Sequence, residues 1–590
     1  MKAKANRNYQ RLVDGAMQRI APDLTIENAM LANMITGECY PACVDILDGI
    51  VIRVRNPEET IALKSKNSYD AKGAYLLPGF VDVHMHIEVT MMAPHNFAKA
   101  AVVWGTTTAV TDPHELGNIL GVPGVRYMVE DSQDTKMRLY TLAPSCVPCS
   151  PGLETSGAEF GAKEISEILE MPGVLGIGEL MDYNNIIHNK GRMPAILAAG
   201  REKNAFLQGH VMAREEKEIA AYILAGPVSD HECRTDEDCS AKMRMGLHID
   251  MKSSSHADYM KGYVEAVKNT PWTDNVTLCT DDIHANDLYE KGHMNHVVKR
   301  AIYYGIDPMR AYRFATYQAA KEYGFEDLGA IAPGYCADMQ LLNALDGSKP
   351  LAVWVDGELI AQDGTYLHED MRQPAPFANT INLAAIKGPE NFVLKAPQGH
   401  KGSVLTALVH HRPNGSPFSS MDYVEMQINE GNIVLPQNQC VVNWACSCNR
   451  YGKQQKTIVP LDHFGLLEGA VAATVSHDSH NFTVVYTNAD DAYLAAQTLS
   501  QCGGGICVTR NGKVEAILEL PIGGVMSVLE CEPLAKQVRQ VEDALNAITQ
   551  APVQLLKIAL LSLPAAPGIH ITDLGLVDGS KQDFVPVFLP

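Results

Sequence analysis

Two histidines and a carboxylate stand at alternate positions in FVDVHMHIE (residues 80–88), directly after an apolar run. In a strand, residues two apart point to the same side, so His84, His86 and Glu88 would share one face. Buried polar groups cost free energy unless they are paired, so this is a poor pattern for a core. Imidazole and carboxylate groups that converge on one point are typical ligands of Zn, Mn or Fe. The segment therefore predicts metal chemistry.

Further polar residues follow other apolar segments, at the point where each predicted strand ends. In chain order they are Asp112, His114, Glu115, Glu179, His210, His231 and Asp281. Four of them, Glu179, His210, His231 and Asp281, combine with the histidine pair into six candidate metal ligands. Six ligands exceed what one tetrahedral catalytic zinc needs, so we expect a two-metal site with a bridging carboxylate.

Strand-like and helix-like segments alternate through the middle of the chain. The strand candidates are LLPGFVDVHMH, TTTAVTD, RLYTLAPSCVP, VLGIGELMD, AFLQGHV, GPVSDHE, GLHIDMKSS and NVTLCTDD. Eight strands that alternate with helices over roughly 250 residues predict a (β/α)8 barrel, an α/β fold. Active-site residues of that fold lie at the carboxyl ends of the strands, where the polar residues above also fall.

Two similar pieces flank the middle section. VDILDGIVIRV (residues 44–54) and VWVDGELI (residues 353–360) each carry an Asp-Gly turn between apolar alternations, which is a hairpin signal. We therefore predict one small β-sandwich domain from residues 1–78 and 332–384, around a barrel at residues 79–331. Residues 385–590 are typical of a further α/β domain.

The composition sets limits on partners and location. A chain of 590 residues is too long for one core, and its formal net charge of −21 argues against a nucleic-acid or anionic-membrane surface. No stretch approaches about eighteen uncharged apolar residues, and the basic start is not followed by the apolar segment of a secretory signal. The fourteen cysteines are scattered, as expected of reduced thiols, so we predict a cytoplasmic enzyme.

The segment TDPHELGN (residues 111–118) allows two interpretations. Asp112, His114 and Glu115 could begin a helix, where acidic groups favour the dipole. The same residues at the mouth of a barrel could instead transfer protons or contact a substrate, and we favour this interpretation.

Two other motifs invite a functional interpretation that we reject. Cys146 and Cys149, with the upstream His-x-Glu at His86, mimic the zinc site of cytidine-type deaminases, but the His-x-Glu ends a strand of a much longer array. SHDSH (residues 476–480) suggests a catalytic triad, yet no glycine-flanked nucleophile elbow accompanies it. We interpret the cysteine pair as structural and the triad as absent.

The assembled motifs resemble a known family. PGFVDVHMH on the first strand, an acid on the fourth, histidines on the fifth and sixth and an aspartate on the eighth resemble the amidohydrolase superfamily. More narrowly, GTTTAVTDPHELGN, PSCVP with ETSGA, GIGELMD, SDHE, CTDDIHANDL, GAIAPG and SHDSHN with LPIGG are similar to the adenine deaminase family. The resemblance covers about residues 25–530. It implies Glu179 in the bridging place that a carboxylated lysine often takes in other amidohydrolases.

This resemblance implies a specific reaction. The chain would convert adenine to hypoxanthine and ammonia in purine salvage, with metal ligands His84, His86, Glu179, His210, His231 and Asp281. The family implies two divalent transition metals, Mn or Fe(II) before Zn, and a homo-oligomer of two or more chains. Asp281 would carry the proton to the leaving ammonia, while His114 and Glu115, ahead of Asp112, would protonate or orient the ring nitrogens.

The strand register separates two adjacent aspartates. In CTDDIHANDL, Asp281 continues the inward face from Cys279 by two residues, so we expect Asp281 to face the site and Asp282 to point away.

Several positions depart from the family pattern. They are Val89-Thr90, Val211-Met212, Lys252 to Ser255, where the family carries Arg-Glu-Gly-Ser, and Cys446 to Asn449. None is a predicted metal ligand, so they leave the reaction class intact and bear on the substrate. The alternative substrates are a modified purine or another cyclic amidine, which would be deaminated, and a cyclic amide, which would be hydrolysed as in dihydroorotases and hydantoinases. A non-catalytic purine or metal sensor is disfavoured, since a binding module does not need Asp281.

Overall fold

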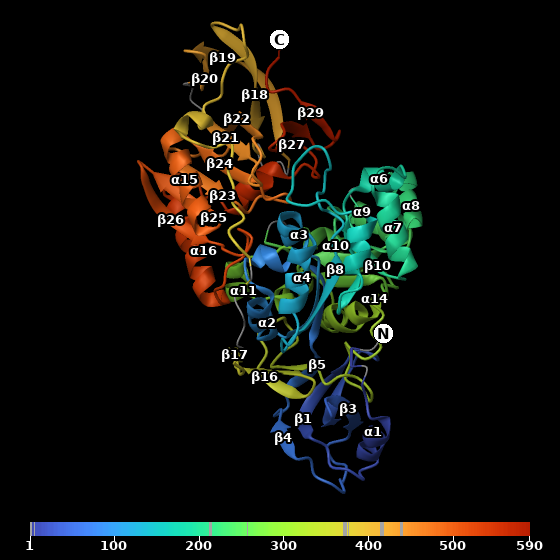
Figure 1. Cartoon of the computed structure of the whole chain (residues 1–590). Coiled ribbons are helices and arrows are strands. Elements are labelled where there is room, and N and C mark those ends of the chain that lie inside the picture. The colour runs from blue at the N-terminus through green and yellow to red at the C-terminus, as the bar shows by residue number, and fades with distance from the viewer. Residues whose placement is uncertain are drawn as a thin grey trace.

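The computed structural model describes residues 3–4, 6–211, 215–255, 258–369, 375, 377–412, 418–436 and 441–589. Figure 1 shows a small sheet region near the N-terminus at the bottom, an α/β region in the middle and a large sheet region toward the C-terminus. The middle region lies between the other two.

Segments from both sides of the middle region form the N-terminal sheet. Its strand order is β17-β16-β15-β14-β5-β1-β2-β3, and β4 pairs with β1. The strands are β1 (Leu24–Asn33), β2 (Glu38–Leu47), β3 (Ile50–Arg55), β4 (Asn67–Asp70), β5 (Tyr75–Pro78), β14 (Met339–Leu342), β15 (Ala352–Val355), β16 (Glu358–Gln362) and β17 (Thr365–Tyr366). A short helix, α1 (Tyr9–Ala16), packs nearby on β3.

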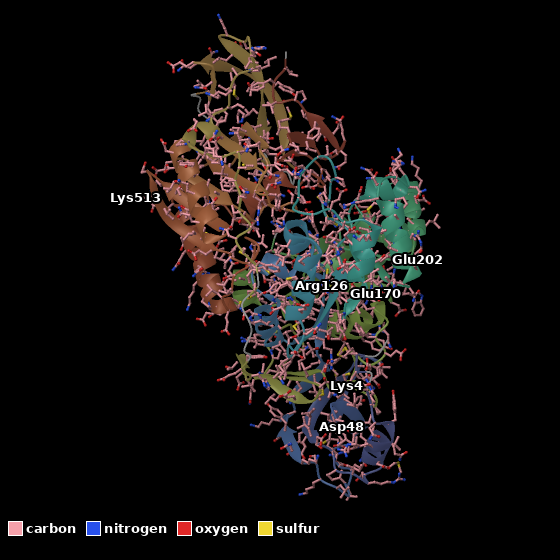
Figure 2. The ribbon with its side chains drawn as sticks, in the orientation of Figure 1. Lys4, Asp48, Arg126, Glu170, Glu202 and Lys513 are labelled. Atoms are coloured by element: carbon pink, nitrogen blue, oxygen red, sulfur yellow. The ribbon has the colours of Figure 1, made fainter. Side chains whose placement is uncertain are left out.

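Both predicted hairpins are confirmed. β2 pairs with β3 around Asp48-Gly49, and β15 pairs with β16 around Asp356-Gly357. All four turn residues have positive φ angles, 53° and 76° in the first turn and 49° and 74° in the second. Asp and Gly tolerate that geometry, which matches the twist of two antiparallel strands. Lys4, labelled in Figure 2 with Asp48, donates from Nζ to the Asp48 carbonyl oxygen at 2.9 Å.

The eight predicted strands of the middle region are all present, and every pairing between them is parallel. They form a five-stranded sheet, β10-β9-β8-β7-β6, and a three-stranded sheet, β11-β12-β13. The strands are β6 (Phe80–Met85), β7 (Thr106–Thr111), β8 (Arg138–Ala143), β9 (Val174–Leu180), β10 (Phe206–Gly209), β11 (Ser229–Asp230), β12 (His248–Lys252) and β13 (Val276–Cys279).

The two parallel sheets meet at both of their edges. On one side, Val228 N donates to Leu207 O at 3.0 Å, which links the start of β11 to β10. On the other side, Asp281 N donates to His84 O at 3.0 Å and His86 N donates to Asp281 O at 3.3 Å. The carboxyl ends of the first and last strands are therefore hydrogen-bonded neighbours.

Helices connect these strands and cover them (Figure 1). They are α2 (Pro94–Val102), α3 (His114–Leu120), α4 (Val122–Asp131), α5 (Ala162–Ile168), α6 (Tyr183–Ile187), α7 (Met193–Glu202), α8 (Glu216–Ala225), α9 (Asp236–Arg244), α10 (Met260–Val267), α11 (Ala285–Lys291), α12 (Met294–Tyr304), α13 (Pro308–Arg313) and α14 (Ala319–Glu322). The ends of α9 show how the sequence sets its bounds. Thr235 accepts a hydrogen bond from Asp238 N at the start, and Lys242 and Arg244 stand in the last turn.

One prediction for the first strand was wrong. β6 ends at Met85, and Ile87–Thr90 form a 3-10 helix, η1, so Glu88 does not continue the strand face of His84. The Glu88 carboxylate instead accepts a hydrogen bond from Leu116 N at 3.3 Å. The alternation rule stops at the end of a strand, and Glu88 lies beyond it.

The C-terminal region contains a nine-stranded sheet in the order β20-β19-β18-β22-β21-β24-β23-β25-β26. Its strands are β18 (Ser403–His410), β19 (Ser420–Asn429), β20 (Asn432–Val434), β21 (Asn443–Cys448), β22 (Lys456–Asp462), β23 (Ala470–Ala473), β24 (Phe482–Tyr486), β25 (Gly505–Arg510) and β26 (Lys513–Glu519). The helices are α15 (Ala489–Cys502), α16 (Cys531–Asn546) and α17 (Leu556–Ala559), and β27 (Ile569–Ile571), β28 (Leu576–Asp578) and β29 (Asp583–Val585) form a small sheet.

The C-terminal sheet shares a hydrophobic core with the middle region. Buried side chains of the sheet, among them Ala473 and Val485, belong to the same apolar cluster as Met92, Phe97 and Leu116. Burial of apolar surface is worth roughly 25 cal/mol per Å², so a shared core of this kind holds the two regions together firmly. It fixes the connection between β23 and β24 against the start of α3.

No helix in the described part of the chain is long and apolar enough to cross a membrane. The cysteines of the same residues are all free thiols. This agrees with the expectation of reduced cysteines, and the cytoplasmic location stays a prediction.

Candidate metal centre and active site

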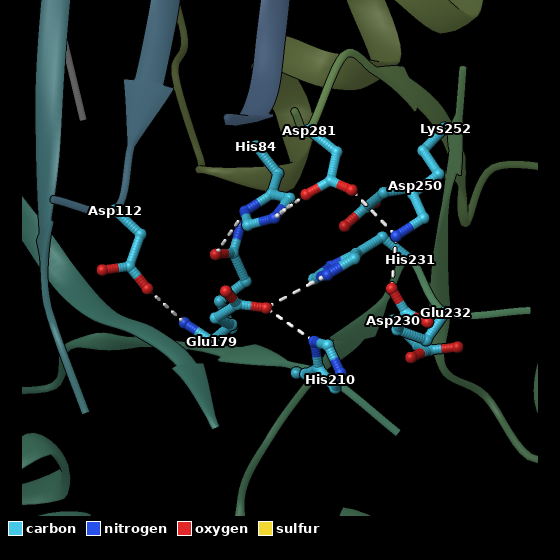
Figure 3. Close-up of polar contacts among 12 residues, drawn as sticks. His84, Asp112, Glu179, His210, Asp230, His231, Glu232, Asp250, Lys252 and Asp281 are labelled. Carbon is cyan, nitrogen blue, oxygen red and sulfur yellow. Dashed lines mark hydrogen bonds and ion pairs between the residues drawn. The ribbon is translucent and has the colours of Figure 1, made fainter. Parts of the chain in front are cut away.

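Glu179, at the end of β9, lies at the centre of the candidate site (Figure 3). Its Oε2 is 2.6 Å from His210 Nδ1 and 3.2 Å from His231 Nε2. Its Oε1 is 3.4 Å from His86 Nε2. Each carboxylate oxygen thus faces a different set of imidazoles, which is the arrangement that a bridging ligand needs.

Asp281, which follows the last strand, faces His84 and His86. Its Oδ1 is 3.2 Å from His84 Nε2 and 3.4 Å from His86 Nε2. The structure therefore brings all six predicted ligands together. Their donor atoms form three groups whose members lie within 4.8 Å of one another: His84, His231 and Asp281; His84, His86 and Glu179; and Glu179, His210 and His231.

Outer partners fix how the first two histidines present their nitrogens. Gln208 Nε2 donates to Val83 O at 3.2 Å, so its Oε1, 2.9 Å from His84 Nδ1, must accept from that nitrogen. In the same way His86 Nδ1 donates to the Asp112 carbonyl at 2.9 Å. In its neutral form each imidazole then turns an unprotonated Nε2 toward the centre, as metal-ligating histidines do.

Burial and charge favour a cation at this place. Burial, reinforced by His231, lowers the pKa of His84 to about 3, so its imidazole is neutral. Burial alone would raise the pKa of Asp281, but Lys252 and the neighbouring histidines hold it well below its usual range. Burial is likewise outweighed at Glu179, where His210 holds the pKa well below normal. Two buried carboxylates among imidazole nitrogens fit a divalent metal.

Asp112 lies behind Glu179. Its Oδ2 accepts a hydrogen bond from Glu179 N at 2.9 Å. A Cβ on Gly178 would come within 2.1 Å of the same oxygen, so this contact requires glycine there. Asp112 is fully buried, and the walls of the inner cavity are formed by His114 and Glu115 instead. This position suits a residue that orients Glu179 more than one that touches a substrate.

His114 and Glu115 begin α3, which confirms the helix start proposed for TDPHELGN. His114 Nδ1 lies 3.4 Å from Glu179 Oε1. Glu115 Oε1 lies 2.7 Å from His477 Nδ1, and Glu115 Oε2 accepts a hydrogen bond from His480 Nε2. Although burial would raise the pKa of Glu115, His477 and His480 hold it well below its usual range.

Two cavities that share lining residues open beside the metal ligands. The inner cavity has a volume of about 110 Å³ and the outer one about 390 Å³. Both are lined by His210, Glu232, Lys252 and Asp281. The C-terminal region supplies part of the inner wall: His477, Asp478, Leu560 and Leu563. The outer cavity is further lined by Arg234, Arg412 and Phe418.

The expected orientation of Asp282 was wrong. Asp282 lines both cavities next to Asp281 instead of pointing away. β13 ends at Cys279, and Asp281 has a left-handed φ angle of 56°. Strand alternation therefore no longer governs the direction of either side chain. Burial and the nearby Asp281 raise the pKa of Asp282 to about 7.

Lys252 and Glu232 are site residues to which sequence reasoning gave no role in the centre. Lys252 Nζ lies 2.8 Å from Asp281 Oδ2 and also forms an ion pair with Glu232 Oε1 (Figure 3). The available signals were the departure at Lys252 and the motif SDHE, which ends in Glu232.

The histidines of SHDSH were also missed as part of the site. Ser476 Oγ lies 2.7 Å from Thr483 Oγ1 and 2.6 Å from Ser562 Oγ. These contacts agree with rejecting the triad. The signal that could have found His477 and His480 was the presence of SHDSHN among the family motifs.

The cysteine pair behaves as two separate buried thiols. Cys146 Sγ donates to Glu179 O and Cys149 Sγ donates to Glu154 Oε1, each at 2.9 Å. Burial, together with Glu179 for Cys146 and Glu154 for Cys149, raises the pKa of both thiols. Protonated thiols with different partners are consistent with a structural role.

Comparisons with known proteins agree with the geometry. The amidohydrolase family matches residues 75–360, and the adenine deaminase C-terminal domain matches residues 418–583. The adenine deaminase of Serratia proteamaculans (strain 568) is 35% identical over 585 residues, which span 98% of this chain and 96% of that protein. The chain belongs to the adenine deaminase family. Adenine deaminase 2 of Carboxydothermus hydrogenoformans is also 35% identical, over 98% of this chain and 99% of that protein.

Solved structures are more distant from this member of the adenine deaminase family. A β-aspartyl dipeptidase from Fervidobacterium islandicum AW-1 is 17% identical and covers 59% of this chain and 100% of its own, with a TM-score of 0.45. A likeness of this degree carries no weight for function. The match to the amidohydrolase family over residues 75–360 indicates a divalent metal, and the donors around Glu179 fit one.

Proposed function

We propose that the chain is a metal-dependent hydrolytic deaminase that converts adenine to hypoxanthine and ammonia. The observation that carries this proposal is Glu179, whose two carboxylate oxygens face separate sets of imidazoles in a member of the adenine deaminase family. A purine is the substrate class, and neither nucleic acid nor a membrane is a partner in this proposal.

The scaffold we propose is a (β/α)8 barrel at residues 79–331. The parallel pairing of β6 to β13 and the hydrogen bonds at both sheet edges support closure of this barrel. A β domain from residues 1–78 and 332–384 and a C-terminal domain from residues 385–590 complete the proposed division. The N-terminal sheet, built from both flanking segments, supports its discontinuous part.

Six residues would hold two divalent metals, with Mn or Fe(II) preferred and Zn possible as a substitute. They are His84, His86, Glu179, His210, His231 and Asp281. Such metals, when bound, supply Lewis acidity and lower the pKa of water toward neutrality. Glu179 would bridge them, and Asp112 holds the Glu179 backbone in place for that role.

Asp281 is the proposed proton carrier. Its Oδ1 faces the centre while its Oδ2 is held by Lys252 at 2.8 Å. A carboxylate fixed in this way can take a proton from the attacking water and deliver it to the leaving amine, which departs as ammonia.

His114 is the proposed contact to a ring nitrogen of the purine, because it lines the inner cavity 3.4 Å from Glu179. Glu115 acts indirectly, through the histidines that it contacts. Both of its oxygens already accept hydrogen bonds or an ion pair from C-terminal histidines, so it orients His114 and His477.

A second candidate substrate is a modified purine or another cyclic amidine. The observation that favours it is Lys252, which replaces an arginine of the family pattern and lines both cavities. A lysine in place of an arginine at this position alters which ring substituents the cavity accepts. The outer cavity of about 390 Å³ has room for a substituent.

The deciding experiment is an assay of protein loaded with Mn(II), which measures ammonia and hypoxanthine from adenine. A panel of substituted purines and of dihydropyrimidine and hydantoin amides is run beside it. Hypoxanthine and ammonia in equal amounts support the proposal. Ring opening of an amide without ammonia from any purine would replace it, and purine binding without turnover would point to a sensor.

A further inference from the structure

Asp478 is a buried carboxylate that the proposed chemistry does not use. It lies in the connection between β23 and β24 of the C-terminal sheet and is only 4% exposed. Its side chain lines the inner cavity together with His86, His114 and Glu179. The C-terminal region thus places a carboxylate in the wall of a cavity whose metal ligands all come from the middle region.

The carboxylate of Asp478 is not satisfied by its neighbours. Its Oδ1 is 3.9 Å from His114 Nε2 and 4.0 Å from His477 Nδ1, both longer than a hydrogen bond. Its Oδ2 has no hydrogen-bond partner among the described residues. A buried polar atom without a partner costs about 1–3 kcal/mol, and more when it is charged. Asp478 also lines the cavity wall, so a ligand donor in the cavity can pair with its carboxylate.

The residues around Asp478 hold it firmly in place. His477 and His480 on either side bind Glu115, and Ser476 N donates to His480 Nδ1 at 3.2 Å. These contacts lock the connection against the start of α3. A group held in this way loses little entropy when it binds a ligand.

The distance between Asp478 and the metal ligands determines which part of the substrate Asp478 would contact. The His114 ring lies between the two groups, with Nδ1 3.4 Å from Glu179 and Nε2 3.9 Å from Asp478. Asp478 is therefore separated from Glu179 by one imidazole ring and two gaps of 3.4 and 3.9 Å. A purine whose C6 lies at the centre can direct its five-membered ring toward Asp478 across that space.

We propose that Asp478 is a specificity-determining residue that accepts a hydrogen bond from the N–H of the five-membered ring, and so selects free purine bases. This inference rests on the proposed function. A carboxylate oxygen accepts hydrogen bonds, and free adenine offers one ring N–H, at N7 or N9. A base substituted at N9 has no such donor. A site built around a hydrogen bond rejects analogues that lack it, because the buried acceptor stays unpaired.

The test compares adenine with 9-methyladenine, which lacks the ring N–H, in wild type and in Asp478→Ala. For adenine, kcat/KM should fall about 10- to 150-fold, the range of a hydrogen bond to a charged group. For 9-methyladenine it should change by less than about threefold, because there is no bond to lose. Asp478→Asn keeps one acceptor oxygen and should recover part of the adenine activity. Metal content should equal that of wild type.

A matched control comes from the same region. Asp573 is a buried carboxylate that binds Asn449 Nδ2 and Thr155 N and does not belong to the inner cavity wall. Asp573→Asn should lower thermal stability and leave the ratio of the two substrates unchanged. Equal losses on both substrates in Asp478→Ala, or full adenine activity, would overturn the inference.

A failure of the proposed function would look different, because wild type would then form no hypoxanthine from adenine. In that case calorimetric titration of Mn-loaded protein with both purines decides the inference. A 10- to 150-fold loss of adenine affinity in Asp478→Ala, with 9-methyladenine unaffected, would support it. Equal affinities of wild type and variant for adenine would overturn it.

Discussion

The carboxylates of Glu179 and Glu115 both lie among buried histidines, yet the two clusters are built in opposite ways. At Glu179, the neighbouring His84 donates its Nδ1 proton outward to Gln208 and turns an unprotonated Nε2 inward. At Glu115, His480 accepts from Ser476 N on Nδ1, so its Nε2 carries the proton and donates it to Glu115. The outer partner of each imidazole sets its tautomer.

This contrast shows why residue types alone do not identify a metal site. Glu115, His477 and His480 are close enough to hold a metal, as are the donors around Glu179. In the Glu115 cluster, however, each carboxylate oxygen is paired with a nitrogen of a different histidine. In the Glu179 cluster, His84 Nε2 has no hydrogen-bond partner among the described residues, and the donor atoms lie beside a cavity. We infer that the first cluster joins two regions of the chain and that the second binds metal.

The largest expected effect comes from Asp281→Asn, which keeps the shape of the side chain and removes its capacity to carry a proton. General acid–base groups contribute on the order of 100- to 10,000-fold, and a group that also contacts the metal ligands should lie at the upper end. Turnover of adenine by Mn-loaded protein measures the loss. Asp282→Asn is the neighbouring control and should cost far less. A larger loss at Asp282 would reassign the proton carrier to that residue.

The next test substitutes the two central carboxylates in turn. Glu179→Gln should reduce the content of about two metals per chain to one or fewer, because one bridging oxygen becomes an amide nitrogen. Glu115→Gln should retain both metals. Elemental analysis after dialysis gives the count, and chelation followed by Mn or Fe(II) should abolish and restore activity. Loss of metal from Glu115→Gln alone would reverse our assignment of the two clusters.

The Glu115 cluster should instead appear in the pH dependence of stability. Burial lowers the pKa of His477, but Glu115 outweighs it and raises the pKa to about 9. A raised pKa stabilises the fold below the unfolded value of about 6.5, and this contribution is lost as pH rises through about 9. The free energy of unfolding of wild type should therefore exceed that of His477→Asn by roughly 3 kcal/mol at pH 6, and this difference should vanish above pH 9.

Chemical denaturation at each pH measures this stability difference. His410→Asn removes a half-buried pair with Asp462 and is the matched histidine control. Its effect should be smaller, within the range of exposed pairs. A difference between wild type and His477→Asn that grows from pH 6 to pH 10 would contradict the ion pair with Glu115.

The smallest expected effect concerns Lys252. Replacing residues 252–255 with Arg-Glu-Gly-Ser should change the ratio of adenine to substituted purines by about tenfold, since a planar guanidinium and an ammonium are not interchangeable at a binding site. Metal content should stay the same. Lys242→Arg is the matched control, because Lys242 is a buried lysine paired with Asp230 outside both cavities. An unchanged ratio would place Lys252 outside the substrate site.

Much of the framework could be predicted from local sequence patterns. The Asp-Gly turns predicted both hairpins, and apolar runs predicted all eight middle strands. The polar residues at the strand ends predicted six donors that the structure brings together. These predictions depend on the backbone period of a single strand and on the meeting of parallel strand ends at one edge, both of which a sequence records directly.

The tertiary structure alone decided the rest. Glu88 and Asp282 follow strand ends, where the alternation rule no longer applies, and both predictions failed there. Glu115 and His480 are 365 residues apart, and their contact depends on how the C-terminal sheet packs against the middle region. The tautomers of His84 and His480 depend on outer partners that no spacing reveals. A sequence pattern reports which side of one element a residue occupies, whereas the chemistry of a buried imidazole depends on every element that packs against it.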